Sequence, residues 1–124
     1  MINMTPKKIL FTQDIVHNIR ELCALVFNIA TDEQLCKIFC ISHEQMEMVM
    51  KQLVNPIPDW IFDHRSLAEE IKNIIAREFI FFQLQEKWDD PHYQDDLENF
   101  INIFSRDIQH KIEAYKNHQL REVR

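Results

Sequence analysis

Residues 31–50 read TDEQLCKIFCISHEQMEMVM, a stretch with two clear helix starts. It contains the same helix-start signal twice, a hydroxyl residue followed three positions later by glutamine. The pairs are Thr31 with Gln34 and Ser42 with Gln45. In such a capping box each side chain bonds a backbone N–H group that the start of a helix leaves unpaired. The stretch therefore predicts two consecutive helices, which begin after Thr31 and after Ser42.

The ends of these two helices are marked as well. The first is predicted to end near Phe39, and the second near Val54, because residues 55–58 read Asn-Pro-Ile-Pro. Proline has no backbone N–H group to donate, and it disfavours helix in the residue before it. We therefore expect a short helix, a tight connection and a longer helix within residues 31–54.

Before this stretch, apolar residues recur in steps of three or four, the spacing that places them on one face of a helix. The start of this helix lies near Thr5, where Pro6 suits the first helical position, or near Thr12. The stripe comprises Phe11, Ile15, Ile19, Leu22, Val26 and Ile29, widened by Cys23, Phe27 and Ala30.

The most apolar part of the chain follows residue 58. A helix is predicted to begin at Asp63 or at Ser66, which fits a capping box with Glu69. From residue 79 to 82 this helix is apolar on all sides, so we expect it to be buried in the middle of the domain or in an oligomer interface. The candidate interface residues are Phe79, Phe81, Phe82 and Trp88.

A last helix is predicted after Asp90 and Pro91, which resemble a cap and a first-turn proline. Its apolar residues are spaced by three or four up to Tyr115, and beyond this residue we expect the helix to fray. We expect it to pack antiparallel to the preceding helix. The chain is then an all-α single domain, residues 1–124, of about five helices with a central pair at residues 31–54.

The chain has 124 residues and no glycine, whereas glycine makes up about 7% of an average protein. Motifs that depend on glycine are therefore excluded: the P-loop, the Rossmann turn, the EF-hand loop and the nucleophile elbow. The serines, Ser42, Ser66 and Ser105, lie at or inside predicted helices. We expect no catalytic residues, no cofactor and no enzymatic activity.

The net charge is −6 at pH 7, with most of the excess acid in the second half of the chain. Several of these acids lie where the last helix should begin, and there they stabilise the positive end of the helix dipole. The functional alternative is a docking surface for a basic partner. The acidic patch comprises Glu86, Asp89, Asp90, Asp95 and Asp96, followed by Glu98.

The cysteines, Cys23, Cys36 and Cys40, lie in apolar helical patterns. An odd number of such cysteines favours reduced thiols in a cytoplasmic protein. Cys36, Cys40 and His43 could bind zinc with Cys23 or His17, but the second paired spacing of a structural zinc site is missing, so we expect no metal. Nothing at the N-terminus resembles a signal peptide, and no apolar run reaches the roughly 18 residues of a membrane span.

Residues 31–50 resemble the helix-turn-helix motif of DNA-binding regulators. Cys36 takes the place of the small residue in the first helix, and Ser42 is the cap of the second. The one departure is Cys40, which stands where the motif has a turn glycine, a residue that adopts the left-handed conformation without steric cost. The resemblance implies a compact helical unit whose second helix faces DNA. The apolar places of the motif are filled by Leu35, Phe39, Ile41, Met46 and Val49.

The outer face of the second helix is the candidate binding surface. Reading DNA needs donors for base edges and cations for phosphates, and two carboxylates on this face oppose both. Nucleic acid is therefore disfavoured by charge, and a protein is the expected partner. The residues of this face are His43, Glu44, Gln45, Glu47, Met48 and Lys51.

These observations rank the function classes. We expect a small cytoplasmic regulatory or adaptor protein that acts through protein–protein contacts, with a protein partner, a homodimer or both. The alternative is a helix-turn-helix DNA-binding transcription regulator. A metal-binding helical bundle, which Asp14 with His17 and Asp107 with His110 suggest, is the least favoured class.

Overall fold

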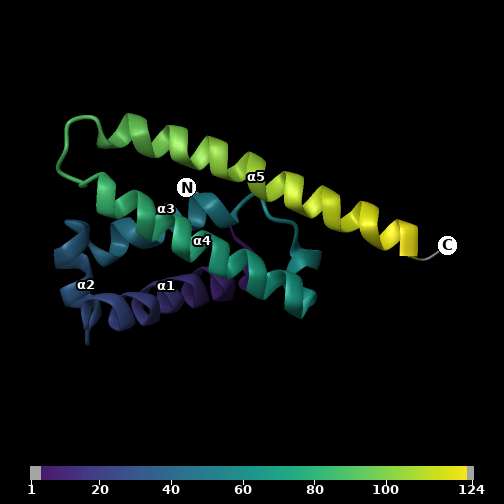
Figure 1. The fold of residues 1–124 in the computed structure, drawn as a ribbon, viewed down its shortest axis with the longest axis horizontal. Helices are drawn as coiled ribbons and strands as arrows, with labels where there is room; N and C mark the ends of the chain where they lie inside the picture. The colour runs from purple at the N-terminus through teal and green to yellow at the C-terminus, as the bar shows by residue number, and fades with distance from the viewer. Residues whose placement is uncertain (1–3, 123–124) are drawn as a thin grey trace.

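The computed structural model describes residues 4–122, with side chains described as far as residue 118. Within this range the chain is helical and contains no strand, so the predicted all-α class is confirmed (Figure 1). The elements are α1 (Pro6–Phe27), α2 (Asp32–Phe39), α3 (His43–Val54), the 3₁₀ helix η1 (Asp59–Asp63), α4 (Arg65–Gln85) and α5 (Tyr93–Glu122).

Both predicted capping boxes form. The Thr31 hydroxyl accepts from the Gln34 backbone N–H at 3.2 Å, and the Gln34 side chain accepts from the Thr31 N–H at 3.2 Å. Ser42 and Gln45 repeat this exchange at 3.1 and 2.8 Å. Thr5 caps α1 without this exchange, through its hydroxyl, which accepts from the N–H of Lys8 at 3.3 Å. The predicted starts of α2 and α3 are therefore confirmed, and α1 begins near Thr5 and not near Thr12.

The turn between α2 and α3 forms even though it contains no glycine. Cys40 adopts the left-handed conformation, with φ 54° and ψ 38°. The N–H of Ile41 donates to the carbonyl of Cys36 at 3.0 Å, and the N–H of Cys40 donates to that of Lys37 at 3.4 Å. This pair of bonds is a Schellman motif, the usual end of a helix before a left-handed residue. Cys40 thus adopts the left-handed conformation that glycine adopts in the turn of the helix-turn-helix motif.

The starts of α4 and α5 differ from the prediction. Asp63 belongs to η1 and pairs with Lys7 at 3.0 Å, whereas Ser66 lies inside α4, so the Ser66 capping box does not form. α5 begins at Tyr93 because the Asp90 carboxylate accepts from the N–H of His92 at 2.8 Å and closes a turn before the helix.

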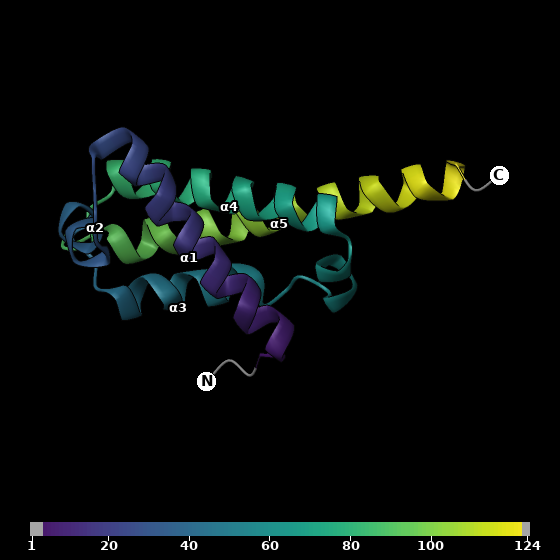
Figure 2. The same cartoon turned by 90° about the horizontal axis from the view of Figure 1, so that it is seen from below.

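The far end of α5 also differs, because the helix continues to Glu122. Its C-terminal part extends beyond the rest of the molecule (Figures 1 and 2). The ring of Tyr115 stacks on Trp60 of η1 at 6.5 Å, and the amine of Lys116 lies over the same Trp60 ring at 5.4 Å. These contacts hold α5 at Tyr115 and Lys116, and the helix continues beyond them to Glu122 without the predicted fraying.

The last turn of α1 does not join the core as predicted. α1 ends at Phe27, and its C-cap residue Asn28 adopts the left-handed conformation at φ 56°. Leu25, Val26 and Phe27 are exposed in this turn, whereas Ile29 returns to the interior. The apolar spacing of three or four was therefore misleading at Val26 and Phe27, because the helix stops before they reach a neighbour.

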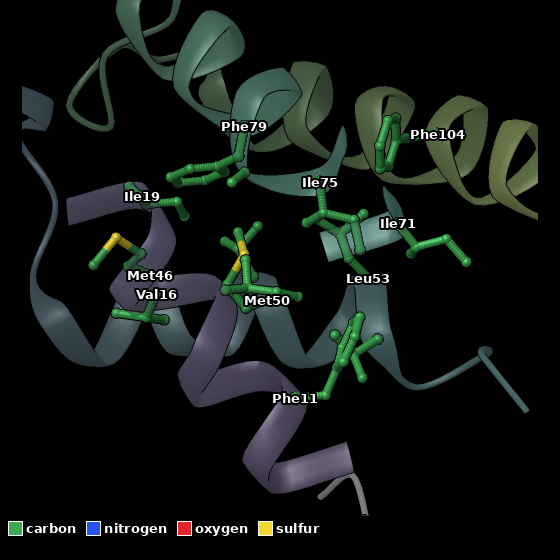
Figure 3. Packing of buried hydrophobic residues seen from close by; sticks show 14 of the residues in the cluster. Phe11, Val16, Ile19, Met46, Met50, Leu53, Ile71, Ile75, Phe79 and Phe104 are labelled. Atoms are coloured by element: carbon green, nitrogen blue, oxygen red, sulfur yellow. The ribbon is translucent and has the colours of Figure 1, made fainter. Parts of the chain in front are cut away.

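α1 packs across both α3 and α4 (Figure 2). Buried side chains from all helices form one cluster, and Figure 3 shows them meeting between α1, α3, α4 and α5. Phe79 of α4 is completely buried there and lies edge-to-face with Phe39 of α2 at 6.1 Å. Its placement among the interface residues was therefore wrong, because Phe79 belongs to the core of its own chain.

α4 and α5 run antiparallel, as predicted (Figure 1). Phe82 near the end of α4 stacks on Phe100 near the start of α5 at 4.6 Å. Glu70 at the start of α4 pairs with Lys111, farther along α5, at 2.6 Å. An aromatic stack near one end and an ion pair farther along therefore join these two helices.

A buried glutamine joins α2, α4 and α5. Gln83 of α4 donates to the carbonyl of Phe39 at 2.9 Å and to that of Glu86 at 3.2 Å. Its side-chain oxygen accepts from the hydroxyl of Tyr93. Lys87 adds a bond to the carbonyl of Ile38 at 3.1 Å. The end of α2 and the start of α5 are thus held against the end of α4.

The left-handed turn leads to a prediction for stability. The left-handed conformation costs a residue other than glycine about 1–2 kcal/mol, so glycine at this position removes that cost. Part of this gain in stability is lost, because glycine has the greater conformational entropy in the unfolded state. We therefore expect Cys40→Gly to raise the free energy of unfolding by about 0.5–1 kcal/mol and Cys40→Val to lower it. Urea unfolding measures both.

The matched control is Lys37→Gly, which places glycine inside α2. It should lower the free energy of unfolding by about 1 kcal/mol. A Cys40→Gly variant as destabilised as Lys37→Gly would contradict the left-handed turn.

Candidate functional site

A groove runs along the surface between α3 and α5, with a volume of about 400 Å³. We call it the α3–α5 groove. Its α3 wall is formed by Met48 and Gln52, and its α5 wall by Gln94, Asp95, Leu97, Glu98, Ile101 and Asn102.

The groove combines an apolar floor with a polar and acidic rim. Leu97 is buried and Ile101 half-buried, whereas the Met48 side chain is 43% exposed. Asp95 and Glu98 supply two carboxylates, and no lysine, arginine or histidine lines the groove. Such a surface can hold apolar side chains and attract positive charge.

The local structure explains why these residues line the groove. On α3, Met46, Val49, Met50 and Leu53 face the core, which leaves Met48 on the outer side of the helix. On α5, Phe104 and Ile108 are buried in the core. The α5 residues on the side of the helix that faces α3 line the groove. Near the end of α3, Gln109 of α5 donates to the carbonyl of Pro56 at 3.5 Å.

The structure divides the predicted binding face of α3. Met48 lines the α3–α5 groove, whereas His43 and Glu47 line a separate hollow beside α1. Gln45 is half-buried and engaged in its capping box. Glu44 and Lys51 are exposed and line neither hollow.

The predicted acidic patch is divided as well. Asp95 reaches the α3–α5 groove, whereas Asp89 and Asp90 lie in the connection before α5. Partial desolvation, together with the carboxyl group of Asp96 and the charge of Asp90, raises the pKa of Glu86 above its usual value. The fold thus brings Asp95, together with Glu98, into the groove, whereas the other members of the patch lie at the end of α4, in the connection and in the first turn of α5.

An apolar strip follows the contact between α4 and α5. Phe81 is 65% exposed and Ile103 is 59% exposed. Phe82, next to Phe81 on α4, and Phe100, one turn before Ile103 on α5, are half-buried and their rings stack on each other. We call these four residues the α4–α5 apolar strip. Trp88, also predicted at the interface, is half-buried and packs on Tyr93 at 4.7 Å. It therefore stabilises the connection between α4 and α5 within its own chain.

Sequence reasoning missed several surface residues. Leu25 is 86% exposed. A second groove is lined by Phe27 and Ile38, among others. The groove residues Gln52, Gln94 and Asn102 were missed too. Their uncharged amides give no signal in a single sequence, and only the packing of α5 beside α3 brings them together.

The thiols differ in burial. Burial raises the pKa of Cys23 to about 11, and burial and the charge of Asp32 raise the pKa of Cys36. Cys40 is exposed in the turn. Among the side chains that the structure describes, no group of three or more histidine, cysteine, aspartate or glutamate residues is placed to hold a metal ion.

Comparison of the chain with protein-family models, curated proteins and solved structures finds no match. Within residues 4–122, none of the helices has the length and apolar character needed to cross a membrane. The function is therefore inferred from the surfaces described above.

Proposed function

We propose that this chain is a small regulatory or adaptor protein that acts through protein–protein contacts and has no catalytic role. Its partner docks on the α3–α5 groove. We place the protein in the cytoplasm, because an odd number of cysteines, all of them free thiols, fits a reducing compartment.

The surface chemistry around α3 carries this proposal. α3 corresponds to the helix that enters DNA in helix-turn-helix regulators, yet α5 lies next to it with the carboxylates of Asp95 and Glu98. α3 itself adds Glu44 and Glu47, against one lysine, Lys51. Phosphates would meet more negative than positive charge on this side of the molecule, whereas a partly basic protein would be attracted.

A DNA-binding regulator is the second candidate, and the left-handed turn at Cys40 is the observation that favours it. Two cations near α3 are engaged by other groups of the chain. Arg20 lies 3.6 Å from Asp32, and Lys8 donates to the carbonyl of Asn55 at 2.5 Å. The protein-binding role therefore ranks first.

The first prediction of this proposal concerns DNA. In fluorescence anisotropy at low salt, where phosphate attraction is strongest, we expect no saturable binding to labelled duplex DNA. Saturable binding whose affinity falls with salt would instead support the DNA-binding regulator.

We also propose a homodimer through the α4–α5 apolar strip. Exposed apolar patches of this kind often mark contacts between proteins. The strip is flanked by charges of both signs, Arg77 and Glu78 on α4 and Arg106 and Asp107 on α5. A second copy, although it also carries a charge of −6, could therefore meet this face without uniform repulsion.

The homodimer is tested by sedimentation velocity over a range of protein concentrations. We expect Phe81→Ser to shift the protein toward monomer, because it removes an exposed apolar side chain from the strip. Leu25→Ser is the matched control, since Leu25 is even more exposed but lies outside the strip. A wild-type monomer at high micromolar concentration, or a dimer that only Leu25→Ser disrupts, would contradict the proposal.

A further inference from the structure

We infer that the α3–α5 groove binds a cationic amphipathic helix, a segment of a partner protein with apolar residues on one face and lysine or arginine on both flanks. The inference rests on the proposed function and adds the chemical class of the partner. It is carried by the apolar floor of the groove, by its two carboxylates, and by the absence of cations among the described residues that line it.

The floor of the groove suits the apolar face of a helix. Leu97 and Ile101 are four residues apart on α5, which separates them by about 6 Å along the helix axis. Apolar residues at positions i and i+4 of a bound helix repeat at the same interval. Met48 lies across from them on α3, and a flexible methionine side chain adapts to apolar groups of different shape.

The rim of the groove selects the charge of the partner. Among the described side chains, no ion pair engages Asp95 or Glu98. The two carboxylates lie three residues apart, on neighbouring turns of the same helix surface. Lysine or arginine residues on one flank of a bound helix could therefore pair with both at once.

The remaining polar side chains of the groove are uncharged amides, one on the α3 wall and the others on the α5 wall. Gln52 and Asn102 offer amide groups that can bond to either donors or acceptors of the partner. An anionic helix would face Asp95 and Glu98 without any compensating cation in the lining. The net charge of −6 would also slow its approach, whereas it would speed the approach of a cationic one.

The inference is tested with three fluorescein-labelled peptides and the full chain. The first is an amphipathic helix with leucine at i, i+3, i+4 and i+7 and lysine on its flanks. The second has glutamate in place of each lysine, and the third has the composition of the first in scrambled order. Anisotropy titrations are made at low and at physiological ionic strength.

We expect the cationic amphipathic peptide to bind most tightly. The double variant Asp95→Asn/Glu98→Gln should weaken it roughly five- to tenfold, and Met48→Ser should weaken it as well. The matched control is Glu33→Gln/Glu113→Gln, which makes the same change in charge outside the groove and should alter the Kd by less than about twofold. Circular dichroism and thermal unfolding establish that each variant is folded.

Each other outcome overturns part of the account. Equal binding of the scrambled peptide, or equal weakening by the control variant, would mean bulk charge attraction and would overturn the inference. Tighter binding of the anionic peptide, weakened by Met48→Ser, would overturn the cationic partner but retain the groove as a docking site. Absence of binding by both amphipathic peptides would overturn the inference and the proposed docking site together.

Discussion

The arrangement of the helices depends on the buried side chain of Gln83. Its amide bonds to the carbonyl of Phe39 on α2, to the carbonyl of Glu86 at the end of its own helix, and to the hydroxyl of Tyr93 on α5. A buried amide without partners would cost about 1–3 kcal/mol for each group left unsatisfied. Because all three bonds point to different segments, they hold only when those segments meet in one arrangement.

This arrangement also determines the α3–α5 groove. Phe39 directly precedes the turn at Cys40, so fixing its carbonyl also fixes where α3 begins. Tyr93 is the first residue of α5, so its bond to Gln83 fixes where that helix begins. Met48 lies on one wall of the groove and Asp95 on the other. Gln83 therefore fixes the positions of both walls, because it bonds to a residue before the start of α3 and to the first residue of α5.

Most of the secondary structure could be predicted from local signals. The two capping boxes identified α2 and α3 to the residue, because they are formed by side chains within one turn of the helix start. The turn at Cys40 could not be predicted in this way. Its conformation is unfavourable for cysteine alone, and it is maintained by the bond from Ile41 to Cys36 and by the burial of Ile41.

The candidate site was predictable only in parts. The sequence identified a group of acidic residues that includes Asp95, and an outer face of the predicted second helix that includes Met48. No local pattern, however, places residues 48 and 95 side by side. For the apolar run at residues 79–82, the burial of each single residue could not be predicted either. Periodicity cannot distinguish Phe79, which is completely buried, from Phe81, which is largely exposed, when every position of the run is apolar.

The most direct test of this account is a double-mutant cycle of Gln83→Leu and Tyr93→Phe, measured as free energies of unfolding in urea. Each single substitution leaves a buried polar partner unsatisfied, whereas the double variant removes both members of the pair. We expect the double variant to cost at least about 1 kcal/mol less than the sum of the two single variants. Additive costs, within about 0.5 kcal/mol, would contradict the role assigned to Gln83.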